Sequence, residues 1–225
     1  MLLPALCLGI ASFASVQVQE FPAPTYFIFL VTGKNPPKAT PEEIQKYQAA
    51  HIDNFKRLFG ERKLITAGPC ADPEKTKRGI VILTVKNEKE ILECFKPDPY
   101  VEKGFMEVQA IKMKVEFGSI NTSGIDPNGI EENRIVLFRR DPLAKGALPT
   151  KLDKASLEYL NSSGAAAGLS FYATMARTAP IDAVALFKGK DDAKIQAWVD
   201  QSPWIRNGVV KATKFPQYLS KGVLP

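Results

Sequence analysis

One histidine and one aspartate are the side chains best suited to proton-transfer chemistry. His51 is the only histidine in the chain, and Asp98 opens the segment Asp-Pro-Tyr-Val-Glu-Lys-Gly at residues 98–104. An aspartate that accepts a hydrogen bond from one imidazole nitrogen fixes the tautomer of the ring and leaves the other nitrogen free to exchange a proton with a ligand. The pair therefore indicates general acid/base chemistry, with His51 as the acid/base and Asp98 as its orienting partner.

Each of these residues also has a purely structural interpretation. His51 lies on the apolar face of a predicted helix, where a histidine is more often a core residue that is hydrogen-bonded to a neighbour. Asp98 precedes Pro99, and an aspartate in this place can cap the turn through its own backbone. The sequence alone leaves both alternatives open.

A helix is predicted over residues 40–60 and carries the histidine. Thr40 can cap it, Pro41 suits the first helical position, and Glu43 completes a Thr-x-x-Glu capping box. Side chains at spacings of three and four share one face of this helix; they are Ile44, Tyr47, His51, Phe55 and Leu58. His51 should therefore point inward.

The other elements of the first half are mostly strands. Short apolar, β-branched or alternating runs predict strands at 25–31, 64–67, 79–85 and 106–117, and a shorter helix is predicted at 87–95. The order β-α-β-β-α-β folds most simply as an antiparallel sheet with both helices on one face, the ferredoxin-like arrangement. In this arrangement the first helix packs beside the second, so His51 and Asp98 can meet. A change of apolar phase near Ala110 predicts a bulge or a twist in the last strand.

The Asp98 motif recurs 104 positions later, where residues 202–208 read Ser-Pro-Trp-Ile-Arg-Asn-Gly. The second copy keeps the proline, an aromatic residue (Trp204 for Tyr100) and the glycine, but Ser202 stands where Asp98 was. The counterpart of His51 lies among residues 155–159, which contain no histidine. The chain is therefore predicted to be α+β, with two tandem ferredoxin-like units of which only the first keeps the ionisable pair.

The pattern divides the chain into four segments. Residues 21–118 form the first unit, residues 119–132 a linker rich in turn formers, and residues 133–225 the degenerate second unit. Residues 1–20 are predicted to be a leader, because they are apolar and carry no charged side chain before Glu20. They are too short to span a bilayer and read as a secretory signal peptide cleaved near Ala14, which predicts export. The alternative is a disordered segment or one packed on the core.

Composition excludes several classes of protein. The 225 residues, 45% of them hydrophobic, suffice for two packed units of about 100 residues each. The net charge of +6 comes from lysines that mostly alternate with acids, which is typical of a solvated surface and not of a nucleic-acid-binding module. No later stretch is apolar enough to span a membrane. Cys70 and Cys94 would remain in the mature chain and are predicted to be unpaired.

Known cofactor and nucleophile motifs are also missing. The sequence contains no Gly-x-x-x-x-Gly-Lys-Ser/Thr phosphate loop, no Gly-x-Gly-x-x-Gly after a strand and no Gly-x-Ser-x-Gly elbow. One histidine and two separated cysteines do not supply a zinc site. We therefore predict no metal and no cofactor.

Taken together, these segments resemble a YCII-related domain over residues 25–117. The resemblance is carried by the helix with His51, the segment Leu-Ile-Thr-Ala-Gly-Pro at 64–69, Gly79 at the start of a strand, and residues 98–104. It implies a dimeric α+β barrel in which two ferredoxin-like units join their sheets, and a catalytic pair that falls on His51 and Asp98. A related member is a dehydrochlorinase of a chlorinated hydroxyquinol, and the wider superfamily includes muconolactone isomerases. Two copies in one chain could replace the homodimer by an intramolecular pseudo-dimer.

The predicted function is therefore a cofactor-independent lyase, isomerase or dehydrohalogenase that is exported and acts on a small cyclic or aromatic molecule. Tyr100, Gly68 and Pro69 are the candidate substrate-binding residues. The first alternative is a non-catalytic protein of the same fold that binds a small ligand or serves as a scaffold, either as a monomeric pseudo-dimer or as a homo-oligomer. A second alternative is a basic surface protein that recognises anionic polymers. The enzyme hypothesis requires a nitrogen of His51 within about 3.2 Å of an oxygen of Asp98, with the other nitrogen facing an open pocket. It fails if His51 is sealed in apolar packing.

Overall fold

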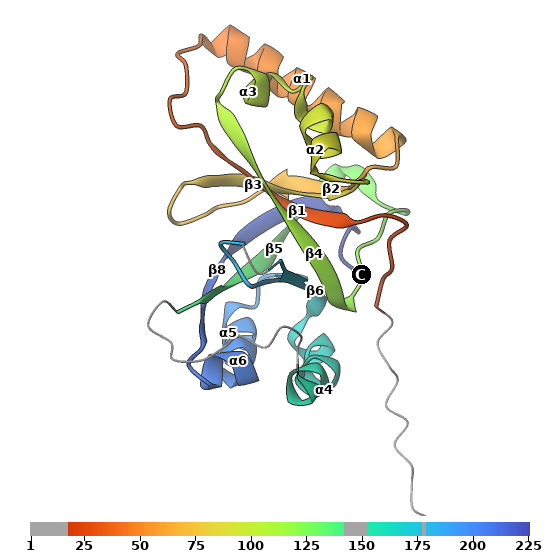
Figure 1. Ribbon diagram of the computed structural model, residues 1–225, viewed down its shortest axis with the longest axis vertical. Coiled ribbons are helices and arrows are strands. Elements are labelled where there is room, and N and C mark those ends of the chain that lie inside the picture. Colours follow the sequence, from red (N-terminus) through yellow and green to blue (C-terminus); the bar gives the residue numbers. More distant parts are fainter. Residues whose placement is uncertain (1–17, 142–152, 177–178) are drawn as a thin grey trace, which may run out of the picture.

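The protein is built from two βαββαβ units that share one eight-stranded antiparallel sheet. The computed structural model describes residues 18–141, 153–176 and 179–225, so most of the predicted leader lies outside the described residues. In Figure 1 the sheet lies in the middle of the molecule, with the helices of the first unit on one side and those of the second unit on the other. Among the described residues, no helix is long and apolar enough to cross a membrane.

The first unit runs β1 (Thr25–Thr32), α1 (Pro41–Gly60), β2 (Leu64–Pro69), β3 (Lys77–Thr84), α2 (Glu88–Phe95), α3 (Pro99–Glu102) and β4 (Met106–Gly118). The second unit runs β5 (Asp126–Arg140), α4 (Lys154–Ser163), a 3₁₀ turn η1 (Ala165–Ala167), β6 (Leu169–Met175), β7 (Ala183–Phe187), α5 (Asp192–Gln201), α6 (Pro203–Arg206) and β8 (Val210–Lys221). The two orders match element by element, apart from η1, as the repeated motif predicted.

Local sequence explains where the helices begin. The predicted capping box at α1 is confirmed: the Glu43 N–H donates to Thr40 Oγ1 at 3.2 Å, and the Thr40 N–H donates to the Glu43 carboxylate at 2.8 Å. Asn87 caps α2 by accepting from the Glu90 N–H at 3.1 Å. These bonds satisfy N–H groups that have no partner inside the helix.

The strand order is β2-β3-β1-β4-β6-β7-β5-β8. Within each unit this is the ferredoxin-like order, with the fourth strand beside the first, and the predicted fold is confirmed. The units join where β4 pairs with β6. At the other edge β8 approaches β2 through one isolated bridge between Cys70 and Gln217, so the sheet curls into a nearly closed barrel, the predicted intramolecular pseudo-dimer.

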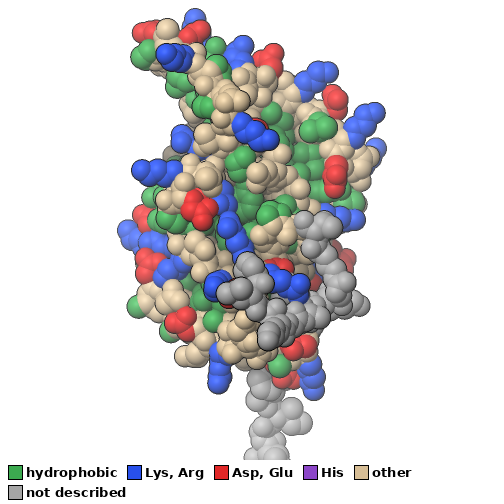
Figure 2. Space-filling model, turned by 60° about the vertical axis from the view of Figure 1, so that its left-hand side comes forward, with side chains coloured by type: hydrophobic (Ala, Val, Ile, Leu, Met, Phe, Trp, Pro, Cys, Tyr) green, Lys and Arg blue, Asp and Glu red, His purple; other side chains and the backbone are tan. Residues whose placement is uncertain are grey.

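Three apolar clusters fill the spaces that this sheet creates. One combines residues from both units and forms the barrel interior; its large members include Phe27, Phe29, Ile80, Ile82, Ile135, Leu137, Phe171, Leu186 and Phe215. The other two lie between the outer faces of the sheet and the helices of each unit. Most charged side chains lie at the surface, although Asp72, Lys77, Asp98 and Arg134 are buried. On the face shown in Figure 2, Lys and Arg side chains are interspersed with Asp and Glu.

Of the two alternatives predicted near Ala110, the bulge is absent. The pairing of β4 with β1 runs without a shift from Met106 to Met113. The apolar residues of β4 change from one face of the strand to the other because different parts of the protein pack on its two ends. Met106 and Val108 pack toward the helices, whereas Ile111 and Met113 face the barrel interior. A register shift does occur later, between Val115 and Phe117 in the pairing with β6.

The segment between the units is shorter than its composition suggested. β5 begins at Asp126, inside the predicted linker, and pairs with the end of β8 from Ile130 onward. The turn formers of this segment do not prevent pairing, because a strand edge needs backbone hydrogen bonds and not apolar side chains. Only residues 119–125 lie between β4 and β5, and the wider domain boundaries stay a prediction.

Candidate functional site

His51 and Asp98 lie in direct contact. The His51 Nδ1 atom is 2.6 Å from Asp98 Oδ2. The Asp98 side chain is fully buried, while 11% of the His51 side chain is exposed. The structure therefore brings together the two residues that the sequence singled out, at a distance that meets the first of the two conditions set for the enzyme hypothesis. The second condition, an open pocket at the other nitrogen, stays a prediction.

Helix packing explains this meeting. The buried residues of α1 are His51, Asn54 and Leu58, so the histidine faces the rest of the unit as predicted. One turn further along, the Asn54 Nδ2 amide donates to the Cys94 carbonyl at 3.1 Å, which ties α1 to the last turn of α2. The chain then turns, with the Asp98 N–H donating to the Phe95 carbonyl at 2.9 Å. The turn after α2 thus places Asp98 beside the middle of α1.

Both interpretations of Asp98 hold at once, because each carboxylate oxygen has its own donor. Oδ1 accepts from the Tyr100 N–H at 3.0 Å and so caps α3, while Oδ2 faces His51. A buried carboxylate needs such partners, since leaving it unpaired away from water is costly. With the Nδ1–H of His51 donating to this carboxylate, Nε2 is the nitrogen left for a ligand.

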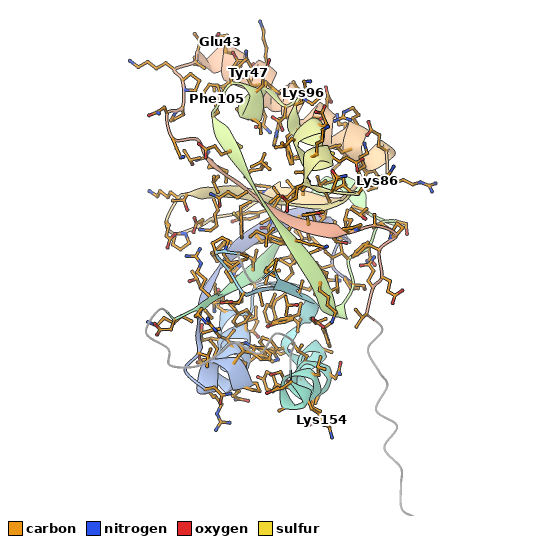
Figure 3. The ribbon with its side chains drawn as sticks, viewed as in Figure 1. Glu43, Tyr47, Lys86, Lys96, Phe105 and Lys154 are labelled. Atoms are coloured by element: carbon orange, nitrogen blue, oxygen red, sulfur yellow. The ribbon has the colours of Figure 1, made fainter. Side chains whose placement is uncertain are left out.

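Aromatic rings surround the histidine. Its ring centroid lies 4.5 Å from that of Phe55 and 5.4 Å from that of Tyr100, both in edge-on geometry. Tyr47 and Phe105 continue the series, with ring centroids 5.8 Å apart and each about 6 Å from Tyr100. Figure 3 shows Tyr47 and Phe105 together beneath the start of α1. We call Tyr47, Tyr100 and Phe105 the aromatic wall.

The aromatic wall lies at the open end of α1. Among residues 41–50 only Tyr47 is partly buried and the others are exposed, so this half of the helix extends past its packing partners. The Lys103 ammonium lies 5.5 Å from the centre of the Tyr47 ring. A flat molecule could approach His51 along these rings, because aromatic pairs favour offset and edge-on contacts.

Tyr100 is held as a neutral group. Its hydroxyl lies 3.2 Å from Gln48 Oε1 and 3.4 Å from the Ile44 carbonyl, two acceptors to which it can donate. Burial raises the pKa of Tyr100, and the nearby negative charge of Asp98 raises it further. The phenol therefore stays protonated near neutral pH and can donate to these acceptors, and the substrate-binding role predicted for Tyr100 stays a prediction.

Gly68 and Pro69 lie elsewhere, at the end of β2. Their carbonyls accept from the Gln217 Nε2 amide at 3.1 and 3.0 Å, across the gap between β2 and β8. Among the contacts given for the described residues, none joins Gly68 or Pro69 to His51. The structure gives them a part in closing the barrel, and a role in substrate binding stays a prediction.

Sequence reasoning missed part of the site. Asn54 and Gln48 were overlooked because only apolar positions were counted on the inner face of α1, yet each lies three residues from His51 and within reach of its neighbours. Phe105 directly follows the Asp98 motif and could have been included with it.

The pockets lined by Phe117, by Asn133 and by Phe59 do not include His51.

The second unit fills the corresponding place with aromatic side chains. Ser202 is fully buried and its hydroxyl donates to the Val199 carbonyl at 2.6 Å. The Tyr159 hydroxyl donates to the Trp198 carbonyl at 2.5 Å, where Trp198 is the counterpart of Cys94. Trp204, the counterpart of Tyr100, has its ring centroid 5.9 Å from that of Tyr159. The second copy thus keeps the packing and lacks the ionisable pair.

The chemistry available at His51 is proton transfer. In the part of the chain that the structure describes, no group of three or more His, Cys, Asp or Glu residues could hold a metal ion. Cys70 and Cys94 are free thiols. A histidine fixed by a buried carboxylate and flanked by rings can take up or release a proton at Nε2.

Comparison with known proteins agrees with this architecture. Residues 27–115 match the family described as the YCII-related domain. No curated protein sequence matches the chain. Among solved structures, the chain is similar to a mutant chlorite dismutase from Candidatus Nitrospira defluvii, with a TM-score of 0.58 and 8% identity over 87% of this chain and 91% of the other.

Two further solved structures cover almost the whole chain. A proposed monooxygenase from Fusobacterium nucleatum gives a TM-score of 0.52 with 11% identity over 90% of this chain and 96% of the other. One from Lactobacillus acidophilus gives 0.50 with 13% identity over 90% and 98%. Identities this low show a shared fold alone. Residues 27–115 therefore match the YCII-related domain, and the chain as a whole has the fold of a dimeric α+β barrel.

Proposed function

We propose that this protein is an acid/base enzyme of the lyase, isomerase or dehydrohalogenase type that acts on a small cyclic or aromatic molecule. The proposal rests on one observation, the 2.6 Å contact between His51 Nδ1 and an oxygen of the fully buried Asp98. His51 is the acid/base, and Asp98 is its positioning partner.

The proposed step uses the free nitrogen of His51. Nε2 accepts a proton from the substrate while the Asp98 carboxylate balances the charge that forms on the ring. An isomerase would return this proton to another atom of the same molecule. In a lyase or dehydrohalogenase, the electron pair that the proton leaves behind would instead form a double bond, and the leaving group would depart from the neighbouring carbon with the electron pair of its own bond.

The aromatic wall supports a ring-shaped substrate. Tyr100 contacts the His51 ring, and Tyr47 and Phe105 in turn contact Tyr100. Lys103 places a positive charge near the Tyr47 ring. A flat ring stacked on these side chains would bring a C–H or O–H group toward Nε2.

The test is a screen of small lactones and halogenated phenols with the wild-type protein, His51→Ala and the matched control Tyr159→Phe. Circular dichroism and thermal melts would show that all three proteins fold. General acid/base catalysis predicts that His51→Ala lowers kcat/KM by about 10²- to 10⁴-fold and that Tyr159→Phe leaves it unchanged. Equal turnover by the wild type and His51→Ala would remove His51 from the mechanism.

A second candidate function is binding without catalysis. It is supported by the small exposed fraction of His51, 11% of its side chain, and by its close packing against Phe55. Under this alternative, compounds from the same screen would bind with measurable affinity and remain unchanged on mass spectrometry. Turnover that depends on His51 would exclude it.

We also propose that the protein is exported. The support is the apolar, uncharged sequence of residues 1–19, with small residues around Ala14. Expression of the full chain in a secreting host and sequencing of the exported N-terminus tests this, with a start near Ser15 expected. Recovery of the intact chain inside the cell, and none outside, would contradict export.

A further inference from the structure

A pocket lies at the other end of α1, away from the aromatic wall. Its volume is about 530 Å³, and its wall combines the segment before β1, the end of α1 and the start of β2. In Figure 1 these segments converge beside the loop that joins the two units. The pocket shares no residue with the aromatic wall.

Hydrogen bonds hold the outer wall of this pocket in place. The Gln19 side chain forms a reciprocal pair with Ile120: its Nε2 donates to the carbonyl at 3.0 Å, and its Oε1 accepts from the N–H at 2.8 Å. The Thr84 hydroxyl donates to the Ala23 carbonyl at 3.2 Å. These hydrogen bonds fix the segments that form the wall, as is usual for small-molecule sites.

Its lining is mostly apolar. Phe21, Leu64 and Ile65 contribute to the wall, and Phe59 adds a ring that is 47% exposed. A volume of this size lies within the range of roughly 300–1,000 Å³ that holds small organic ligands. Together these side chains give the pocket an apolar wall against which an apolar group can pack.

Arg62 is a positively charged residue in the wall of this pocket. It lines the pocket and has a φ of 57°, a left-handed conformation that glycine adopts most easily at the end of a helix. The surrounding bonds are those of a helix stop, with the Arg62 N–H on the Phe59 carbonyl at 2.9 Å and the Lys63 N–H on the Leu58 carbonyl at 3.0 Å. A long cationic side chain at a position that favours glycine points to a use for that side chain.

The guanidinium of Arg62 is also available. Its neighbours Arg57 and Lys63 both pair with Glu61, whereas no ion pair is formed by Arg62 within the described residues. Glu20 lines the same pocket and forms no ion pair with Arg62 either. A guanidinium group that has no partner within the protein can bind a carboxylate through two hydrogen bonds.

We propose that this pocket binds a small apolar molecule that carries one carboxylate. The apolar body lies against Phe21, Phe59 and Leu64, and the carboxylate pairs with Arg62. This site is separate from His51 and does not depend on the function proposed there.

The test uses octanoate and octanol, titrated into the full chain by isothermal titration calorimetry. Octanoate is expected to bind in a saturable way and about tenfold or more tightly than octanol, since a charged hydrogen bond is lost with the alcohol. Arg62→Gln and Arg62→Gly should each weaken octanoate by about tenfold. Glycine accepts the left-handed backbone, so Arg62→Gly keeps the fold and its loss of affinity reports the missing guanidinium.

Two control variants complete the design. Arg78→Gln removes an exposed arginine on β3 and should leave octanoate affinity within about twofold. His51→Ala should also leave it unchanged, which separates this site from the proposed catalytic one. The proposal is overturned if octanoate and octanol bind equally, if Arg62→Gly keeps the wild-type affinity, or if His51→Ala abolishes binding.

Discussion

The contact between His51 and Asp98 shows what a motif can predict at the scale of single residues. Each residue was found from its type and place, and their meeting followed from the order of the elements. Asn54 escaped detection because a polar side chain interrupts an apolar pattern, although its bond to the Cys94 carbonyl is what ties α1 to α2. Packing partners of this kind become visible only when two helices are placed side by side.

Replacing Asp98 by asparagine should separate its two roles. An asparagine oxygen can still accept from the Tyr100 N–H, so the cap on α3 survives. Its amide, however, would face His51 Nδ1 as a donor and would favour the tautomer that carries the proton on Nε2. We expect Asp98→Asn to lower kcat by 10²-fold or more, while unfolding in urea shows a loss of about 1–3 kcal/mol.

Ser202→Ala is the matched control for this change, because it alters the corresponding buried position of the second unit. It should leave kcat unchanged. Wild-type turnover by Asp98→Asn would show that Asp98 acts only as a helix cap.

Cys70 gives a prediction that does not depend on the proposed activity. Burial raises the pKa of this thiol to about 11, and the nearby Asp72 carboxylate adds to the shift. At pH 8 its thiolate fraction is therefore about 100-fold below that of an ordinary cysteine. Alkylation by iodoacetamide, followed by peptide mass spectrometry to separate Cys70 from Cys94, should be slow at pH 8 and should accelerate about tenfold per pH unit toward pH 11. A rate that levels off by pH 9 would contradict the shifted pKa.

At the scale of elements, helix caps were easier to predict than the point at which the buried face of a strand changes. The Thr40 box marked the start of α1 because its hydrogen bonds are local. The change of apolar phase in β4 suggested a bulge, but its cause is that the strand packs against helices at one end and faces the barrel interior at the other. The polar start of β5 was taken for a linker because its pairing with β8 involves residues about 90 positions away.

The hairpin between β2 and β3 depends on a buried ion pair. Asp72 accepts from the Lys77 N–H at 2.9 Å and from the Thr76 hydroxyl at 2.9 Å, and its carboxylate lies 3.3 Å from Lys77 Nζ. Burial alone would raise the pKa of Asp72, but these hydrogen bonds and the charge of Lys77 hold it below the ordinary value. Asp72→Ala would leave Lys77 without its closest partner, and we expect a loss of about 3 kcal/mol in the free energy of unfolding at pH 7.

The pH dependence of this loss follows from the sign of the shift. A lowered pKa in the folded state stabilises the protein above the unfolded value of about 4, and the contribution disappears as pH falls through the lower, folded value. Urea unfolding at pH 7, 5 and 3 should therefore show the gap between wild type and Asp72→Ala narrowing below pH 4. A gap of constant size across this range would contradict the ionic origin of the effect.

At the scale of the whole molecule, the repeat predicted that the two units would join their sheets, but not that the two joints would differ. The joint between β4 and β6 is an ordinary antiparallel ladder. The joint between β2 and β8 has one backbone bridge, and the side chain of Gln217 supplies further bonds to the Gly68 and Pro69 carbonyls. A glycine at 68 is needed there because a Cβ would collide with the Tyr218 carbonyl oxygen. Such close approach between distant strands has no local signal in the sequence.

Removing Gln217 should therefore open one joint and leave the other closed. Its side chain is fully buried, and Gln217→Leu would leave the Gly68 and Pro69 carbonyls without its amide, at an expected cost of about 2–3 kcal/mol. Hydrogen–deuterium exchange should accelerate in residues 68–71 and 216–219 and stay unchanged in residues 113–118 and 171–175. Thr174→Val, which removes a hydroxyl bond to Glu116 across the β4–β6 joint, is the matched control and should not affect the β2–β8 segments. If Gln217→Leu accelerated exchange equally at both joints, the barrel would open as one cooperative unit, and the weak joint inferred from the pairing would not exist as a separate site of opening.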